Sequence, residues 1–393
     1  MRPAPSANSD EVLNPPEIEQ CAARWLQRLV QIPSVTPLQA GPRAGQPGEE
    51  RIAGQLAEWF RQLGGEVEIE EVLPGRPSVY GIWQGPSARW FGVDVHTDTV
   101  GVEQMTDEPF DGRLENGRVY GRGAVDTKAT LGVVLALLEW MQESGRTPAG
   151  QLLIAATADE EATATGAAAL AARLRGRNLV VDQMVVAEPT LCQPVHGHKG
   201  VVRMTLRFEG QACHSSTPEL GRNAVTAAAR VTLAFEEEHQ RLQRVSPVSP
   251  LGPGTLMVTR IQGGRGVNIV PDQCELTLDR RLVNAENAGA VRDQLIALAH
   301  AASPVPVTVE RGLEINAFWQ TPDSPFVRSL SQWSGQTPVI APYCTNAWAY
   351  PATARECVVL GPGSIAQAHG ATEWVATSEL GKLGEIFRTW WEL

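Results

Sequence analysis

The sequence predicts an α/β protein with a mostly parallel sheet, into which a second, smaller α+β domain is inserted. Strand-like runs alternate with helical patterns from residue 17 to about residue 199. Between residues 200 and 312 the order changes to strand, helix, two strands, helix and strand, which is the split motif of small two-layer sandwiches. Helical periodicity then returns near the C-terminus. Alternating strands and helices favour a mostly parallel sheet. Because helical patterns return only after the insert, we expect the C-terminal segment to complete the first domain.

The elements of the first domain follow from apolar periodicity and from Gly and Pro boundaries. Residues 1–16 are polar and rich in proline, and they predict a disordered tail. Helices are expected over 17–30, 49–63, 130–141, 166–174, 324–333 and 379–391, and strands over 67–72, 90–95, 151–156 and 183–187. The first domain is therefore expected to comprise residues 17–199 and 313–393.

The insert has its own set of elements. Strands are expected over 201–208, 255–261, 273–282 and 305–310, and helices over 223–242 and 285–300. Residues 200–312 are long enough to form an independent domain.

Composition and charge exclude several classes of function. The 393 residues carry 33 Lys and Arg against 44 Asp and Glu, a formal net charge of −11. Binding to nucleic acid or to an anionic membrane needs a basic surface, so neither partner is expected. No apolar run reaches the ~18 residues of a spanning helix, and no export signal is recognised. The six cysteines form no C-x-x-C pair, so we expect reduced thiols and a cytoplasmic protein.

Two short motifs place polar groups at the ends of predicted elements. His96 and Asp98 stand two residues apart at the end of a strand, where alternate side chains share one face. An imidazole beside a carboxylate suits a metal ligand with an orienting partner, although a His that only caps the strand end is the alternative. Asp126 follows the turn Gly121–Gly123 and precedes a buried helix. It either caps that helix or ligates a metal.

Acidic residues follow two further strands. Asp159, Glu160 and Glu161 stand after one strand and Glu188 after the next, where parallel α/β sheets build their sites. Buried neighbouring carboxylates repel one another unless a cation compensates them. His369 ends a Gly-rich loop.

Taken together, these residues predict a centre for two metals. Two His, one Asp and two Glu supply nitrogen and oxygen ligands without thiolate, which suits Zn, Co or Mn. A bridging carboxylate would join the two ions. A spare Glu beside a ligand Glu is what a general base requires.

The motifs together resemble the zinc-dependent family that holds acetylornithine deacetylase, succinyl-diaminopimelate desuccinylase, aminoacylase and glutamate carboxypeptidase. The resemblance runs from about Glu17 to Trp391, with five motifs in family order. It implies a catalytic α/β domain with an inserted lid domain, and a homodimer through the lid. It also implies a metal-dependent hydrolase of linear amides with two divalent ions per chain, Zn first and Co or Mn as alternatives.

The resemblance also assigns roles to single residues. As metal ligands it implies His96, Asp126, Glu161, Glu188 and His369, with Asp126 bridging both ions. It implies that Asp98 hydrogen-bonds His96 and tunes its basicity. Glu160 would be the general base that takes a proton from water at the metals and delivers it to the leaving amine.

The insert carries a signature of its own. The segment Gly210–Pro218 resembles the family segment whose His reaches the substrate carbonyl, so His214 is expected to stabilise the developing oxyanion. A loop His that caps the following helix is the alternative. Asn268 matches a family Asn near the substrate. Arg281 matches a family Arg that holds a substrate carboxylate, for which a bidentate guanidinium gives the geometric reason.

Subfamily features resemble the acetylornithine deacetylases, through His96–Val100 and the loop that ends at His369. Asn346 and Thr127 depart from that subfamily. Asp94 departs from the wider family and is interpreted as a surface strand residue, with an acid that supports the metal ligands as the alternative. The predicted function is removal of the acyl group from an N-acyl amino acid similar to N-acetylornithine. A dipeptidase or carboxypeptidase of the same fold, acting on a short peptide, is the first alternative. A metal-free binding protein that retained the fold is the second.

Overall fold

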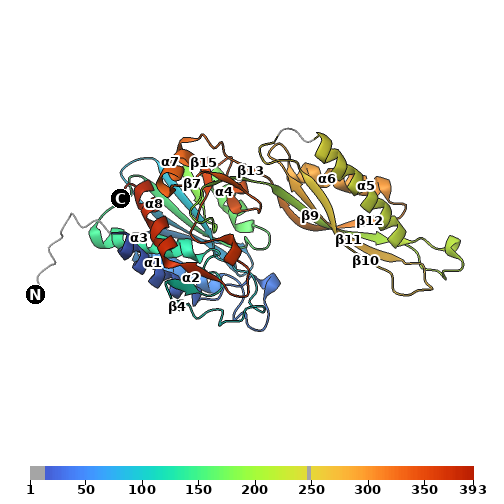
Figure 1. Cartoon of the computed structure of the whole chain (residues 1–393), viewed down its shortest axis with the longest axis horizontal. Coiled ribbons are helices and arrows are strands. Elements are labelled where there is room, and N and C mark those ends of the chain that lie inside the picture. Colours follow the sequence, from blue (N-terminus) through green and yellow to red (C-terminus); the bar gives the residue numbers. More distant parts are fainter. Residues whose placement is uncertain (1–13, 246–248) are drawn as a thin grey trace, which may run out of the picture. The chain divides into compact units, whose positions relative to one another are not determined.

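The computed structural model describes residues 14–245 and 249–393, and it divides into two compact units (Figure 1). The first unit comprises the chain through His196, together with Gln320–Val339 and Thr345–Leu393. The second comprises Gly197–Trp319 and Ile340–Cys344. Strands and helices alternate in the first unit, and an antiparallel sheet with two helices forms the second. The predicted fold class is therefore confirmed.

The prediction of a disordered tail over residues 1–16 is wrong for Pro15 and Pro16, because these two residues begin helix α1 (Pro15–Val30). The side chain of Asn14 accepts the N–H of Glu17, and the side chain of Glu17 accepts the N–H of Asn14. This reciprocal capping box starts the helix, and proline at the first helical positions removes no helical hydrogen bond. Residues 1–13 of the predicted tail lie outside the described residues.

The main sheet lies in the order β1-β2-β6-β3-β7-β15-β8-β13, with β14 paired to β8. Its central strands β6, β3, β7 and β15 run parallel, whereas the outer pairs are antiparallel. The strands are β1 (Glu66–Leu73), β2 (Arg76–Trp83), β3 (Trp90–His96), β6 (Gln151–Thr157), β7 (Val181–Val186), β8 (Val195–His198), β13 (Phe318–Trp319), β14 (Val339–Ala341) and β15 (Ala354–Val359). The sequence predicted β1, β3, β6 and β7, whereas β2, β8, β13, β14 and β15 were not predicted.

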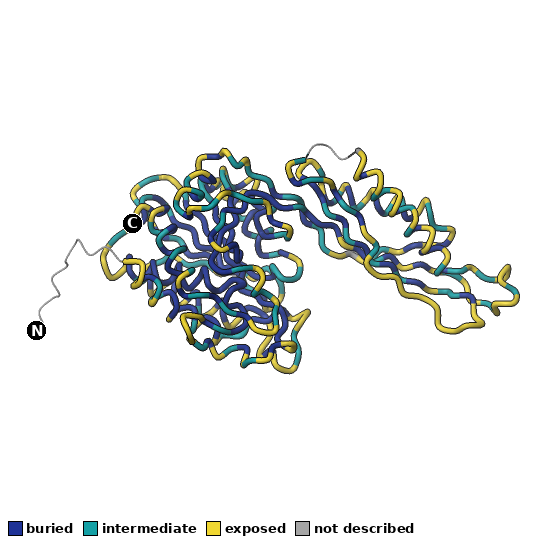
Figure 2. Tube along the Cα trace, viewed as in Figure 1, coloured by how far each residue is buried: buried dark blue, intermediate teal, exposed yellow. Residues whose placement is uncertain are grey.

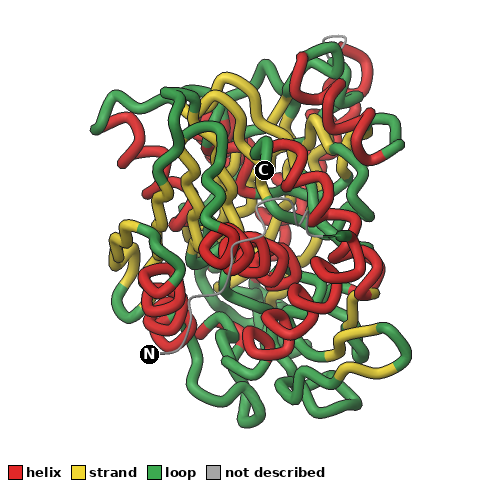
Figure 3. Tube along the Cα trace, turned by 90° about the vertical axis from the view of Figure 1, so that its left-hand side faces the viewer, coloured by secondary structure: helices red, strands yellow, loops and turns green. Residues whose placement is uncertain are grey.

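Six helices cover this sheet in the described part of the first unit. They are α1, α2 (Glu50–Gln62), α3 (Lys128–Ser144), α4 (Thr165–Gly176), α7 (Pro325–Ser334) and α8 (Thr377–Trp390). Helices α1, α3 and α8 pack against one another (Figure 1). Figure 3 shows several helices lying in front of the strands on this side of the molecule. Because α3 lies among these helices and also contacts β3, 13 of its 17 residues are buried. A helix covered on all sides needs apolar residues all round.

A small third sheet brings a C-terminal segment beside the start of the Asp126 loop. It has the order β16-β5-β4, with β4 (Leu114–Glu115), β5 (Arg118–Tyr120) and β16 (Trp374–Ala376). Trp374 pairs with Tyr120 and Ala376 with Arg118. Residues just after His369 are thereby held against the segment that precedes Asp126.

The second unit is a four-stranded antiparallel sheet in the order β10-β11-β9-β12. Its elements are β9 (Gly200–Glu209), α5 (Ala224–Val245), β10 (Thr255–Gly263), β11 (Gln273–Leu282), α6 (Ala288–Ala302) and β12 (Val307–Ile315). Burial alternates along β11, because one face packs on the two helices and the other does not (Figure 2). This is the predicted split order of strands and helices.

Asp94 is not the surface residue that the sequence suggested, since it is fully buried on the central strand β3. Its carboxylate accepts hydrogen bonds from Thr157 Oγ1 at 2.6 Å and from the Tyr350 hydroxyl at 2.6 Å. Burial raises the pKa of this carboxyl group, although both hydrogen bonds oppose the shift. Every residue of β3 after Trp90 is buried, so both faces of the sheet are covered at this strand, and the topology rather than the local sequence sets that covering. Among the described residues, no helix is long and apolar enough to cross a membrane.

Candidate metal centre

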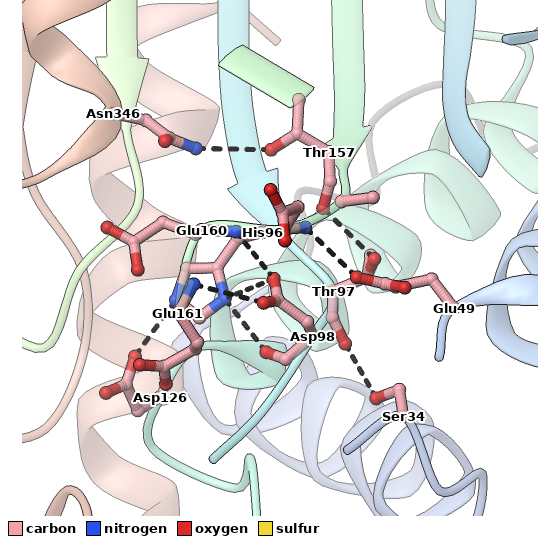
Figure 4. Close-up of polar contacts among 12 residues, drawn as sticks. Ser34, Glu49, His96, Thr97, Asp98, Asp126, Thr157, Glu160, Glu161 and Asn346 are labelled. Atoms are coloured by element: carbon pink, nitrogen blue, oxygen red, sulfur yellow. Dashed lines mark hydrogen bonds and ion pairs between the residues drawn. The ribbon is translucent and has the colours of Figure 1, made fainter. Parts of the chain in front are cut away.

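The predicted ligand residues gather at the carboxyl end of the parallel strands. His96 is the last residue of β3, Glu160 and Glu161 follow β6, and Glu188 follows β7. Strands β6, β3 and β7 are neighbours in the sheet, and the carboxyl ends of parallel strands meet at one edge. Figure 4 shows His96, Glu160, Glu161 and Asp126 converging there.

Asp126 stands between the two histidines. Its Oδ1 lies 3.1 Å from His96 Nε2, and its Oδ2 lies 3.2 Å from His369 Nε2. The same His369 nitrogen lies 3.2 Å from Glu161 Oε1. Each carboxylate oxygen of Asp126 therefore faces a different imidazole, which is the arrangement that a bridging ligand needs.

Two groups of side chains bring their donor atoms within 4.8 Å of one another. The first group is His96, Asp126 and Glu161, and the second is His96, Glu160 and Glu188. Buried carboxylates at this density need a compensating positive charge. Imidazole and carboxylate donors without a thiolate fit a divalent ion such as Zn, Co or Mn.

The pKa values at this site follow from burial and from the neighbouring charges. Burial raises the pKa of Glu160 to about 8, and the carboxylates of Glu161, Asp98 and Asp126 add to that shift, whereas His96 opposes it. Burial likewise raises the pKa of Glu188 well above its ordinary value.

Asp126 and His369 shift in the opposite sense. Burial alone would raise the pKa of Asp126, but hydrogen bonds from His369 and His96 outweigh it and lower the pKa. Hydrogen bonds to Asp126 and Glu161 raise the pKa of His369 to about 10. Each imidazole therefore favours the ionised form of Asp126, and Asp126 in turn favours the protonated form of His369.

Asp98 orients the loop that carries the acidic pair. Its Oδ1 accepts the N–H of Glu160 and its Oδ2 accepts the N–H of Glu161, each at 3.0 Å. His96 Nδ1 lies 3.0 Å from the main-chain oxygen of Asp98 and 3.6 Å from its carboxylate. Asp98 therefore contacts both the histidine and the backbone of the two glutamates.

A buried ion cluster behind Asp98 was missed from the sequence. Arg76 of β2 binds Glu49 through Nε at 2.7 Å and Nη2 at 2.5 Å, and its Nη1 pairs with Asp159. Its Nη2 also lies 3.6 Å from Asp98. Asp159 is therefore engaged by Arg76. No local pattern signals this cluster, because Arg76 lies 83 positions from Asp159.

The candidate substrate residues His214, Asn268 and Arg281 all belong to the second unit. His214 pairs with Ile269 in an isolated antiparallel β-bridge, and Ser215 N donates to the main-chain oxygen of Asn268 at 3.0 Å. His214 and Asn268 therefore lie on adjoining loops. Arg281 lies on β11, where its Nε donates to Asp279 Oδ1 at 2.7 Å and its side chain is 29% exposed.

The family model described as peptidase family M20/M25/M40 matches residues 92–392. The chain belongs to this peptidase family. This match confirms the family that the motifs indicated. The chain, called the M20 chain below, is a metallohydrolase.

Relatives of this M20 chain include acetylornithine deacetylases. Acetylornithine deacetylase of Aliivibrio salmonicida (strain LFI1238) is 30% identical over 371 residues, which cover 88% of this chain and 92% of that protein. The enzyme of the same description from Erwinia tasmaniensis is 30% identical over 371 residues, with 90% and 92% covered.

Solved M20 structures share the fold of this chain. A metallo-carboxypeptidase from Sulfolobus solfataricus matches with a TM-score of 0.74 at 19% identity, covering 95% of this chain and 99% of that one. A dinuclear metal-binding peptidase from Bacillus subtilis matches with a TM-score of 0.64 at 15% identity, covering 95% and 99%. At these identities the likeness concerns the fold alone.

Proposed function

We propose that this M20 metallohydrolase removes the acyl group from an N-acyl amino acid similar to N-acetylornithine. It would use two divalent metal ions, for which Zn is the first choice. The observation that carries the proposal is the convergence of two imidazoles on the two oxygens of Asp126, with Glu161 and Glu188 beside them. The acetylornithine deacetylases at 30% identity over most of the chain support this substrate class.

We assign the ligands from their positions. His96 and Glu188 would hold one ion, Glu161 and His369 the other, and Asp126 would bridge the two. Bound there, divalent cations would supply Lewis-acid polarisation of the scissile carbonyl and would make water more acidic.

Glu160 is proposed as the general base. Its carboxylate accepts a proton from the attacking water as the new C–O bond forms, and it then delivers that proton to the amine nitrogen as the amide C–N bond breaks. Burial raises the pKa of Glu160 toward neutrality, which suits a group that takes up and gives back a proton near physiological pH. Asp98 holds the backbone of Glu160 at 3.0 Å and thereby positions this base.

Three residues of the second unit are proposed to bind the substrate. His214 would stabilise the developing oxyanion, and Asn268 would contact the substrate from the adjoining loop. Arg281 would hold the substrate carboxylate, since a guanidinium fork matches a carboxylate. Arg281 donates through Nε to Asp279, which orients its side chain.

The second unit, residues 200–312 in the sequence-based division, is proposed as a lid and as the surface of a homodimer. Its strand β10 is an edge strand, and it exposes Met257 (51%) and Ile261 (49%). Leu233 of α5 is 66% exposed. Unpaired strand edges with apolar side chains favour pairing with another chain.

Metal analysis followed by one assay panel tests the proposed function. Divalent metal bound by the purified chain is quantified, and amine release is measured from N-acetylornithine, N-acetylcitrulline, N-acetylmethionine, N-succinyl-diaminopimelate and a dipeptide, with added Zn or Co. Release from acetylated amino acids is the expected result. Cleavage of the dipeptide alone would assign the chain to the peptidase alternative. Absence of both metal and turnover would leave the binding-protein alternative.

A further inference from the structure

Arg122 lies where three separate segments of the metal centre meet. Its side chain is 1% exposed. Nε donates to the main-chain oxygen of Gly101 at 3.2 Å, in the loop that follows β3. Nη2 donates to the main-chain oxygen of Gly370 at 3.3 Å, directly after His369. Nη1 pairs with Glu373 Oε2 at 2.5 Å. Each nitrogen of one guanidinium therefore binds a different group.

Glu373 extends these contacts to the Asp126 loop. Its Oε1 accepts the N–H of Val125 at 3.0 Å and the N–H of Asp126 at 3.1 Å. Its main-chain oxygen accepts the N–H of Gly121 at 3.0 Å. The Glu373 side chain is fully buried. Glu373 thus holds the backbone of Asp126 without touching the carboxylate that faces the histidines.

The turn around Arg122 is shaped for this approach. Gly121 and Gly123 have φ of 130° and 83°, a region that favours glycine. A Cβ at Gly121 would lie 2.5 Å from Val30 Cγ1 and 2.9 Å from the main-chain oxygen of Pro109. Only glycine lets the turn come this close to its neighbours.

His369 needs support from outside its own loop. Its side chain is 52% exposed, and its φ of 60° is unusual for a residue with a Cβ. A strained backbone persists only where its surroundings hold it. The bond from Arg122 to Gly370 and the pairing of β16 with β5 provide that support.

We propose that Arg122 and Glu373 are positioning residues that hold Asp126 and His369 at the geometry required to bind a divalent cation. A buried ion pair is a weak source of stability, because desolvation of both charges opposes their attraction. The pair instead fixes the positions of three loops, at residues 101, 126 and 370, relative to one another. These loops lie far apart in the sequence. The inference rests on the proposed function of the metal centre.

Zinc titration of the metal-stripped full chain tests the proposal by calorimetry. E373Q keeps the side-chain shape and an oxygen that can accept both N–H groups, but it removes the charge that faces Arg122. R122K keeps the charge but loses the forked donors to Gly101 and Gly370. Partners outside the ligand set change metal affinity by about 10- to 100-fold, and we expect a loss of that size in both variants while circular dichroism shows them folded.

E286Q is the matched control. Glu286 pairs with Arg280 in the second unit, where that arginine is also buried. We expect E286Q to lower the melting temperature without changing zinc affinity. If E373Q and R122K bound zinc like the wild type, or if E286Q weakened binding as much as they did, the positioning role would be refuted. R122K, which conserves charge, decides the question if E373Q does not fold. A wild-type chain that binds no zinc would instead overturn the proposed function and this inference with it.

Discussion

Replacement of Glu160 by glutamine should abolish turnover and stabilise the metal-free protein. The two effects have one cause, the burial that raises the pKa of Glu160 from 4.5 to about 8. Between about pH 4.5 and pH 8 the unfolded chain ionises this carboxyl group while the folded chain holds it protonated, so the unfolded state is favoured increasingly as pH rises.

The magnitude follows from that pH window. One pH unit corresponds to about 1.36 kcal/mol, and about 2.5 units separate the ordinary pKa from pH 7, which gives an upper value of about 3 kcal/mol. Because Glu160 is half-buried, solvent reduces this value to roughly 1–3 kcal/mol. Glu160→Gln should raise the free energy of unfolding by that amount at neutral pH. The gain should vanish as pH falls below about 4.5, where both states are protonated.

Urea unfolding of the metal-stripped chain, followed by tryptophan fluorescence, measures the stability effect. All tryptophans except Trp319 belong to the first unit, so the signal reports on the unit that carries Glu160. The control is Glu108→Gln, which makes the same chemical change at an exposed position. Turnover of the metal-loaded Glu160→Gln variant should fall by about 10²- to 10⁴-fold, the usual contribution of a general base. Normal turnover, or a stability at neutral pH no higher than that of the control, would refute the reasoning.

Three further predictions concern other parts of the molecule. Arg76→Met leaves the buried carboxylates of Glu49 and Asp159 without their cation and should therefore lower the free energy of unfolding by about 3–5 kcal/mol. Urea unfolding measures this change, and an unchanged midpoint would contradict the prediction. Arg281→Ala should raise KM for a substrate with a free carboxylate far more than for its amide, and equal effects on both would argue for a structural role. Removing metal with a chelator should lower the melting temperature, and zinc at 100 times its dissociation constant should restore about 2.7 kcal/mol; a melting temperature independent of zinc would contradict a metal centre.

Local sequence patterns were sufficient to predict the elements that carry the site. The strands that end at His96 and before Glu160 could be recognised because apolar runs and the polar residues after them are adjacent in the sequence. Since parallel strands end at one edge, their terminal side chains were expected to meet. The class of the fold and the family followed from the order of these elements and motifs.

Contacts between distant segments were beyond this reasoning. Asp94 was placed on the surface because the pattern along one strand does not reveal that distant segments, such as the one that carries Tyr350, cover both faces of the sheet at β3. Asp98 was linked to His96, two residues away, but its hydrogen bonds to the backbone of Glu160 and Glu161 depend on the pairing of β3 with β6.

The sequence by itself determined the kinds of donor atom available, their order and the elements that carry them, because these depend on neighbours within a few residues. Only the tertiary structure decided which buried charges compensate one another. Arg122 and Glu373 lie 251 positions apart, and nothing local relates them. Their pairing follows from the way β16 returns to β5. A buried charge must find its partner wherever the topology places one, so such partners are fixed by the fold as a whole.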